Sequence, residues 1–218
     1  MKRIASNIFP ASVLAMLLLV GGCAMRAEVP PLPRPSGTMA VAGFTSPRFN
    51  WELLAGYLPT EGQTASPQVV TDLNLLMLNI LGEHGVTEFS RPSQVAQCKE
   101  IVSYEQSSEK HMAAFKYWVE VGRCMPVDTI LVPQVLYWKE KSQDVLGNVQ
   151  PASVVIDFYL IDVKDARIIR RYHYDETQQS LTDNLLEAGK YFKRKGEWVS
   201  AMELAHEGVE AGLRELGL

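Results

Sequence analysis

The residue of this chain best placed for chemistry is Cys23, because of the sequence that precedes it. Two basic residues, Lys2 and Arg3, lie ahead of an apolar run over residues 13–20, and two glycines then lead directly to the cysteine. An apolar run of this length is too short for an ordinary membrane-spanning helix, and a basic start with small residues at the end is typical of an export signal. The sequence therefore predicts that residues 1–22 are a signal peptide.

The stretch from Val13 to Cys23 resembles the lipobox of bacterial lipoproteins, in which an aliphatic run and two small residues precede a cysteine. The resemblance implies that the Cys23 thiol receives a diacylglyceryl group and that the mature chain begins there. Ala24, rather than Asp, follows it, which by the sorting pattern of enterobacterial lipoproteins implies an outer-membrane anchor with the domain facing the periplasm. Four prolines within residues 30–35 predict an extended tether, so that residues 23–38 link the lipid to a domain.

The other two cysteines, Cys98 and Cys124, are candidates for a disulfide. Export places them in an oxidising compartment, where paired thiols form bridges. We expect a Cys98–Cys124 disulfide that stabilises the fold by roughly 3–4 kcal/mol in the chain-entropy model. Two separately buried thiols are the alternative interpretation. A zinc site is disfavoured because no histidine lies nearby at ligand spacing.

Polar and aromatic side chains gather on the strands predicted between residues 129 and 174. Asp157 lies in mid-strand between apolar neighbours, and Arg170 or Arg171 faces it if the strands pair as neighbours. A cross-strand ion pair is the simpler interpretation, and a ligand-orienting pair on an open face is the alternative. The residues predicted for such a binding face are Tyr137, Trp138, Asp157, Tyr159, Arg170 and Tyr172.

Motifs of enzymes, cofactor sites and metal sites are missing from the sequence. There is no glycine-rich phosphate loop and no nucleophile elbow, and His206-Glu207 has no second histidine at zinc-protease spacing. We therefore expect no catalytic residue, no cofactor and no metal. The net charge of −4, with basic clusters confined to 167–171 and 190–195, argues against nucleic acid as a partner.

Apolar periodicity, caps and turn residues predict the secondary structure. Ser66 caps a helix that starts at Pro67 and ends at Gly82, and Ser200 with Glu203 forms a capping box that opens the last helix. Further helices are predicted over 93–105, 108–122 and 181–193, and strands over 39–44, 86–89, 129–139, 153–162 and 167–174. Pro133 predicts that the third of these strands is locally an edge or a bulge.

A long connection over residues 45–65 is unusual because it carries Phe49, Trp51, Leu53 and Tyr57. Loops of this length are uncommon unless they are functional. We expect either a segment that packs on the domain or a segment that binds a partner.

These elements predict a single αβ domain over residues 39–218. The fold class is α/β with α+β-like segregation: a mixed sheet that includes a C-terminal antiparallel three-stranded meander and is covered by helices.

Three segments carry a resemblance to a known fold: residues 39–44, 127–132 and 160–169. In order and character they resemble the αβ domain shared by the N-terminal domain of the Tol-system propeller protein, the curli secretion lipoprotein and the lipoproteins that activate penicillin-binding proteins. The resemblance implies a non-enzymatic envelope role through protein contacts. A pair of membrane-spanning hairpins, which a curli-type pore requires, is not found in the sequence.

The function predicted from these observations is a lipid-anchored binding or assembly module, with the membrane and an envelope protein as partners. One alternative is a small-ligand binder or hydrolase that uses Asp157, Arg170 and Tyr159 on the meander face. The other is a structural component of a secretion or appendage complex. The sequence does not predict the oligomeric state.

Overall fold

The computed structural model describes residues 32–59, 64–105, 112–145, 147–178, 194 and 197–218. The predicted signal peptide, Cys23, most of the tether and the predicted helix over 181–193 lie outside these residues. Among the described residues, no helix combines the length and the apolar character needed to cross a bilayer.

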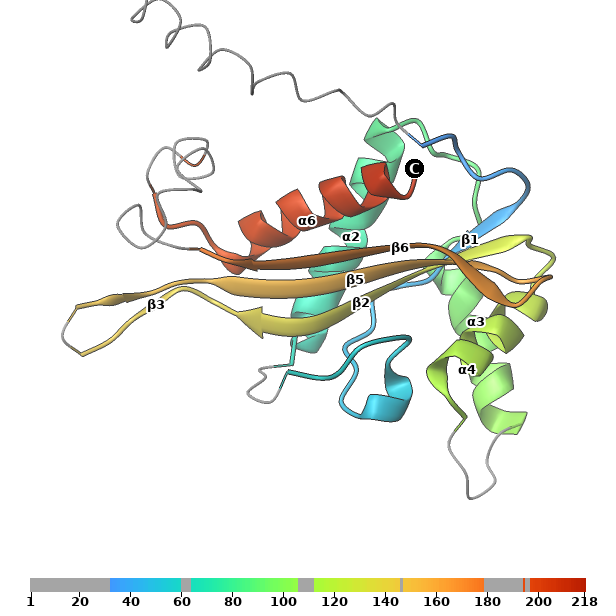
Figure 1. The fold of residues 1–218 in the computed structure, drawn as a ribbon, viewed down its shortest axis with the longest axis horizontal. Coiled ribbons are helices and arrows are strands. Elements are labelled where there is room, and N and C mark those ends of the chain that lie inside the picture. Colours follow the sequence, from blue (N-terminus) through green and yellow to red (C-terminus); the bar gives the residue numbers. More distant parts are fainter. Residues whose placement is uncertain (1–31, 60–63, 106–111, 146, 179–193, 195–196) are drawn as a thin grey trace, which may run out of the picture. The chain divides into compact units, whose positions relative to one another are not determined.

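A four-stranded mixed sheet is the centre of the fold, in the order β1-β2-β5-β6 (Figure 1). β1 (Met39–Val41) runs parallel to β2 (Thr129–Lys139). β2, β5 (Ser153–Asp162) and β6 (Arg167–Thr177) pair in antiparallel fashion. The predicted mixed sheet with a C-terminal meander is thereby confirmed.

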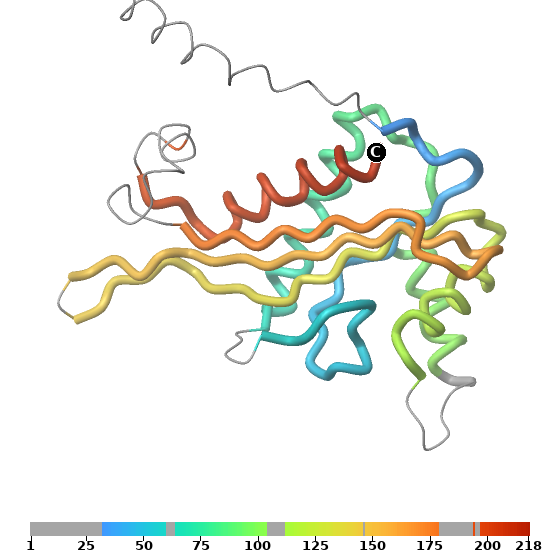
Figure 2. The backbone as a smooth tube through the Cα atoms, in the orientation of Figure 1, coloured from blue at the N-terminus to red at the C-terminus, as the bar shows by residue number. Residues whose placement is uncertain are grey.

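The β2–β5 connection continues as a narrow ribbon (Figure 2). Its strands, β3 (Ser142–Gln143) and β4 (Val149–Gln150), form a separate two-stranded sheet. In the turn, Asp144 donates its backbone N–H to Asn148 and accepts one from Gly147. Gly147 adopts a positive φ of 84°, a conformation that favours glycine.

Two helices, α2 (Pro67–Glu83) and α6 (Ala201–Glu215), cover one face of the sheet, which we call the helix face. The predicted caps are present: Ser66 accepts a hydrogen bond from Val69 N–H, and Ser200 and Glu203 form the capping box. The apolar stripe of α6 is fully buried, and its members are Ala201, Leu204, Ala205, Val209, Leu213 and Leu216.

The opposite face is covered at one end by α3 (Pro92–Glu105) and α4 (Ala114–Arg123). A disulfide joins Cys98 in α3 to Cys124 at the end of α4, with Cα atoms 5.8 Å apart. Trp118 and Val119 of α4 are buried against the strands.

Two predicted strand assignments are wrong. Residues 86–89 do not form a strand, because Val86 N–H returns to the Leu81 carbonyl to close the end of α2. The following chain meets β1 at one bridge, between Ala40 and Ser90. β1 itself ends at Val41 rather than at residue 44.

Pro133 lies where β2 is locally an edge, because β1 has already ended on that side. Its carbonyl still accepts a hydrogen bond from Thr45 N–H at 3.2 Å. The bulge of β2 is at Leu136, between Val135 and Tyr137, and not at the proline.

Candidate binding site

Residues 45–59, which we call the aromatic loop, cover the part of the sheet that α3 and α4 leave open. The side chain of Gln134, in the middle of β2, holds this loop from below. Its Nε2 donates to the Glu52 carbonyl at 2.9 Å, and its Oε1 accepts from Leu54 N–H at 3.2 Å. Gln134 is only 1% exposed, so these two hydrogen bonds satisfy an amide that would otherwise be buried without partners.

The inner side of the aromatic loop packs on the sheet. Leu53 is buried against Leu136 and Val155, and Leu58 and Tyr137 pack around this small cluster. The loop therefore packs on the domain, as one of the two interpretations of its sequence predicts.

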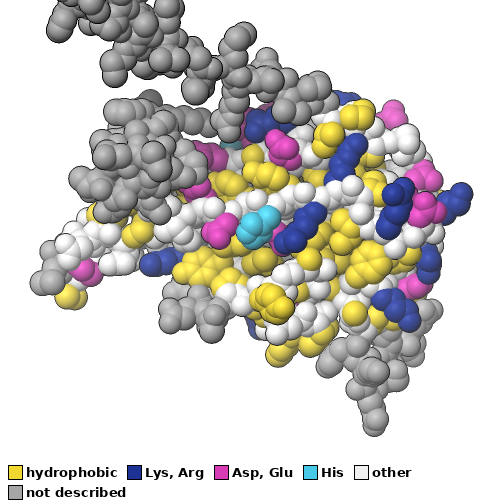
Figure 3. Space-filling model, viewed as in Figure 1, with side chains coloured by type: hydrophobic (Ala, Val, Ile, Leu, Met, Phe, Trp, Pro, Cys, Tyr) yellow, Lys and Arg dark blue, Asp and Glu magenta, His cyan; other side chains and the backbone are white. Residues whose placement is uncertain are grey.

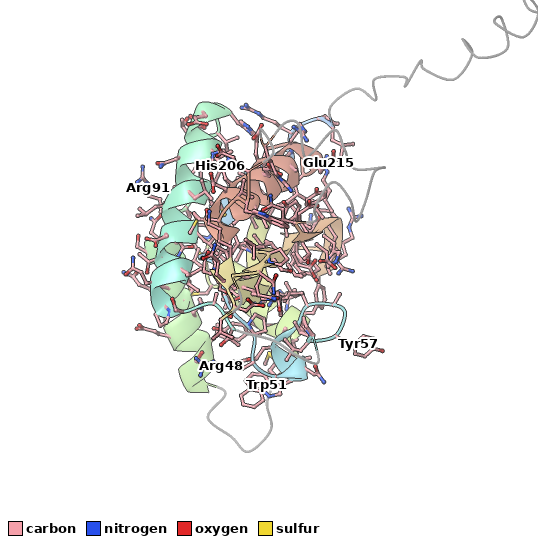
Figure 4. All side chains as sticks on the ribbon, turned by 90° about the vertical axis from the view of Figure 1, so that its left-hand side faces the viewer. Arg48, Trp51, Tyr57, Arg91, His206 and Glu215 are labelled. Atoms are coloured by element: carbon pink, nitrogen blue, oxygen red, sulfur yellow. A yellow bond between two sulfur atoms is a disulfide. The ribbon has the colours of Figure 1, made fainter. Side chains whose placement is uncertain are left out.

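The outer side of the same loop exposes aromatic rings to solvent. Phe49 is 56% exposed, Trp51 40% and Tyr57 88%. The Phe49 and Trp51 rings stack with centroids 5.7 Å apart, and Trp51 lies in the short 3-10 helix η1 (Asn50–Glu52), which Phe49 precedes. Trp51 and Tyr57 project away from the sheet (Figure 4), and hydrophobic side chains gather over this part of the surface (Figure 3).

Asp157 lies on the face of the sheet that the aromatic loop covers, which we call the loop side, and it has no exposed surface. It accepts hydrogen bonds from Tyr159 Oη at 2.6 Å and Arg171 Nη2 at 3.0 Å, and its other oxygen lies 2.6 Å from His173 Nδ1. Burial raises the pKa of Tyr159, and the hydrogen bond to the Asp157 carboxylate raises it further. The Arg171 guanidinium lies 5.3 Å from the centre of the Tyr159 ring. This network satisfies a buried carboxylate internally.

The six residues of the predicted binding face divide between the two faces of the sheet. Side chains alternate along a strand, and the bulge at Leu136 resets the alternation in β2. Tyr137, Asp157 and Tyr159 belong to the loop side. The helix face holds the other three, which are Trp138, Arg170 and Tyr172. The expectation that these six residues share one face is therefore wrong.

The hydrolase alternative loses its candidate residues for the same reason. Asp157 and Tyr159 are fully buried, so neither reaches a substrate. Arg170 lies on the opposite face and donates from Nη1 to the Leu216 carbonyl. Of the two arginines that the sequence offered as partners of Asp157, Arg171 forms the ion pair and Arg170 does not. Within the described residues, no group of three or more acidic, histidine or cysteine side chains is arranged to hold a metal ion.

A cavity of about 370 Å³ opens between the aromatic loop and the α3–α4 pair. Its walls include Thr45 and Trp51 from the loop, Lys99 and Ser103 from α3, and Tyr117 and Trp118 from α4. The Lys99 ammonium lies 5.4 Å from the centre of the Trp118 ring. Burial lowers the pKa of Lys99 and raises the pKa of Tyr117.

Sequence reasoning missed both Gln134 and the cavity. The signal for Gln134 was a single amide within the apolar run of β2. The cavity had no local signal, because the loop residues in its walls lie more than 40 residues from those of α3 and α4 in the chain.

No family model matches this chain, and a search of curated proteins finds no similar sequence. Solved structures with partly similar folds include the following three. PelC from Paraburkholderia phytofirmans, a dodecamer, is 14% identical, with 86% of this chain and 92% of that chain covered and a TM-score of 0.45. The LpoB C-terminal domain from Escherichia coli is 14% identical, with 75% and 96% covered and a TM-score of 0.37.

The third is lipoprotein GNA1162 from Neisseria meningitidis, 13% identical, with 74% of this chain and 100% of that chain covered and a TM-score of 0.38. Because the identities and TM-scores are this low, no function is inferred for this chain from the three proteins. The family resemblance drawn from the sequence stays a prediction.

Proposed function

We propose that this protein is a lipid-anchored, non-enzymatic binding module of the cell envelope, and that it contacts a partner protein through the aromatic loop. The observation that carries the proposal is the loop itself. Its inner side is fixed to the sheet by Gln134 and Leu53, while its outer side exposes Phe49, Trp51 and Tyr57.

A loop of this kind is suited to binding for an energetic reason. Large exposed aromatic side chains are enriched in protein interfaces, where Trp and Tyr contribute most of the binding energy. Hydrogen bonds and packing already hold the backbone of the loop, so association costs less conformational entropy than it does for a free segment.

Cations border the aromatic surface and indicate the chemistry of the partner. Arg48 lies exposed within the loop, and Lys99 shares the cavity with Trp51. The Glu52 carboxylate accepts hydrogen bonds from the backbone N–H groups of Arg48 and Phe49. We therefore expect a partner with an apolar surface bordered by carboxylates.

The position of the tether supports the same function. Arg34 donates to the carbonyls of His84 and Gly85, so the described end of the tether is fixed at the C-terminal end of α2. The aromatic loop lies toward the other end of this helix (Figure 1). The 17 residues of α2 span about 25 Å, so the aromatic loop lies about that far from the site where Arg34 holds the tether.

In-cell crosslinking with a photoreactive residue at position 75 or 101 and mass spectrometry of the products tests the partner. Both positions carry exposed apolar residues outside the loop, Leu75 and Ile101. We expect the chain that carries only the photoreactive residue to crosslink one envelope protein, and the further substitutions Trp51→Ala and Tyr57→Ala to reduce the yield by about tenfold or more. Leu32→Ala, another exposed apolar site, is the matched control and should leave the yield unchanged. A yield that is unaffected by the loop substitutions would refute the proposal.

Metabolic labelling with radioactive palmitate tests the anchor. The wild-type chain and Cys98→Ser should both incorporate the label, whereas Cys23→Ser should not, since it lacks the thiol that receives the diacylglyceryl group. Equal labelling of Cys23→Ser would show that the lipid site is wrong.

A further inference from the structure

We infer that the cavity between the aromatic loop and α4 binds the C-terminal residue of the partner polypeptide, with its free carboxylate beside Lys99 and its apolar side chain against the tryptophans. This inference rests on the proposed function, since it names the group that the loop surface receives.

Lys99 is the first reason. Its pKa is lowered by burial, and no ion pair joins its ammonium to a carboxylate of the described residues. The contact it does make is with the face of the Trp118 ring. A partly buried ammonium without a counter-ion loses hydration and gains little in return, so a carboxylate that enters the cavity would supply the missing partner.

Thr45 is the second reason, and it is independent of the first. Its Oγ1 atom is buried and has no hydrogen-bond partner among the residues that the structure describes, although its residue lines the cavity. Buried hydroxyl groups are rarely left unsatisfied in folded proteins. A hydroxyl group donates well to a carboxylate oxygen, and a carboxylate has enough lone pairs to accept from an ammonium and a hydroxyl at once.

The size and walls of the cavity decide between the sources of a carboxylate. A volume of about 370 Å³ is at the small end of ligand pockets and suits one amino-acid residue better than a nucleotide or a lipid. Trp51 and Trp118 provide apolar walls beside the cation. A chain terminus presents a carboxylate and an apolar side chain on the same carbon, whereas an Asp or Glu side chain leaves the indole walls uncovered.

Calorimetric titration of the full-length chain in detergent tests the inference with three small probes. N-acetyl-phenylalanine has the terminal carboxylate, its α-amide lacks the charge, and N-acetyl-glutamate α-amide carries a carboxylate on a side chain. We expect the first probe to bind at least about tenfold more tightly than either of the others. Equal affinity for the acid and its amide would overturn the inference, and tighter binding of the glutamate probe would overturn the assignment to a chain terminus.

Substitutions at Lys99 give the matched comparison. Lys99→Gln should abolish the preference for the acid, Lys99→Arg should retain it, and Thr45→Val should reduce it. Lys116→Gln, an exposed site on α4, is the control and should change nothing. A preference that survives in Lys99→Gln would refute the role of the ammonium.

The crosslinking experiment separates this inference from the proposed function. If crosslinks respond to Trp51→Ala but not to Lys99→Gln, and the acid is not preferred, the loop binds a partner and the cavity does not. If N-acetyl-phenylalanine binds more tightly than its amide while Trp51→Ala leaves the crosslinking yield unchanged, the cavity is a ligand site and the proposed partner surface is wrong.

Discussion

The two faces of the central sheet are closed by different means. On the helix face, α6 lies so near the strands that a Cβ on Gly208 would be 2.6 Å from the Tyr174 ring, and one on Gly212 would be 2.6 Å from the Phe158 ring. The opposite face is covered by two segments: the disulfide-linked pair α3 and α4, and the aromatic loop, which is held by the Gln134 side chain.

This difference separates stability from binding. Where α6 crosses the strands, the helix face is closely packed, because Gly208 and Gly212 bring the helix against the rings of Tyr174 and Phe158. The loop side is closed by short segments, and it keeps exposed rings and a cavity where these segments meet. The surface that we propose for a partner therefore lies on the side of the sheet that is closed by short segments.

Removal of the disulfide should have the largest effect on this contrast. Since the bridge closes a loop of 26 residues, the double substitution Cys98→Ser with Cys124→Ser should lower the free energy of unfolding by about 3–4 kcal/mol in denaturant titrations. Hydrogen exchange should rise first in α3 and α4. The double variant should also be insensitive to reductant, unlike the wild type. Equal loss of protection in α6 would contradict the independence of the two faces.

A methyl group on α6 tests the close packing of the helix face. Gly212→Ala places a Cβ against the Phe158 ring and should destabilise the fold by about 2 kcal/mol in the same titration. Gly82→Ala, in α2, is the matched control because a Cβ there meets nothing within 4 Å. It should be neutral or stabilise by about 0.5 kcal/mol. Similar effects of the two substitutions would show that the helix face is not packed as described.

Removal of the glutamine side chain tests the loop side. Gln134→Leu leaves Leu54 N–H and the Glu52 carbonyl without their partner and should cost about 1–2 kcal/mol. Hydrogen exchange within residues 45–59 should accelerate more than in α2. Gln68→Leu removes an exposed hydrogen bond to Asp72 and should change stability by less than about 0.5 kcal/mol. Unchanged exchange in the loop would show that Gln134 does not hold it.

The capping box of α6 gives the smallest effect and a pH dependence. Hydrogen bonds from Ser200 N–H and its hydroxyl group hold the pKa of Glu203 below its ordinary value of 4.5. Because the folded-state pKa is the lower one, this stabilisation is complete above pH 4.5 and is lost as the pH falls through the folded-state value.

Glu203→Gln should therefore be less stable than the wild type by about 0.5 kcal/mol near neutral pH, and the difference should shrink below pH 4.5. Glu210→Gln, exposed on the same helix, is the control. A difference that grows as the pH falls would contradict the sign of the pKa shift.

Local patterns predicted most of the fold. The bounds of β2 and β5 and the capped starts of α2 and α6 agree with the sequence, because alternation, helical periodicity and caps depend on residues close together in the chain. The predicted strand at 86–89 was wrong for the opposite reason. A short apolar run has no partner of its own, and the end of α2 determines where it goes.

The sequence by itself determined the fold class, and it predicted the pairing of Cys98 with Cys124 and a lipid at Cys23. These depend on composition, on spacing and on a cysteine count that allows one internal pair. Tertiary structure alone decided that Asp157 and Arg170 lie on opposite faces, because the register of β5 with β6 pairs Arg170 with Leu160, three residues along β5 from Asp157. It alone also decided that Lys99, Thr45 and Trp51 line one cavity, since residues so far apart in the chain meet only when two elements pack on the same sheet.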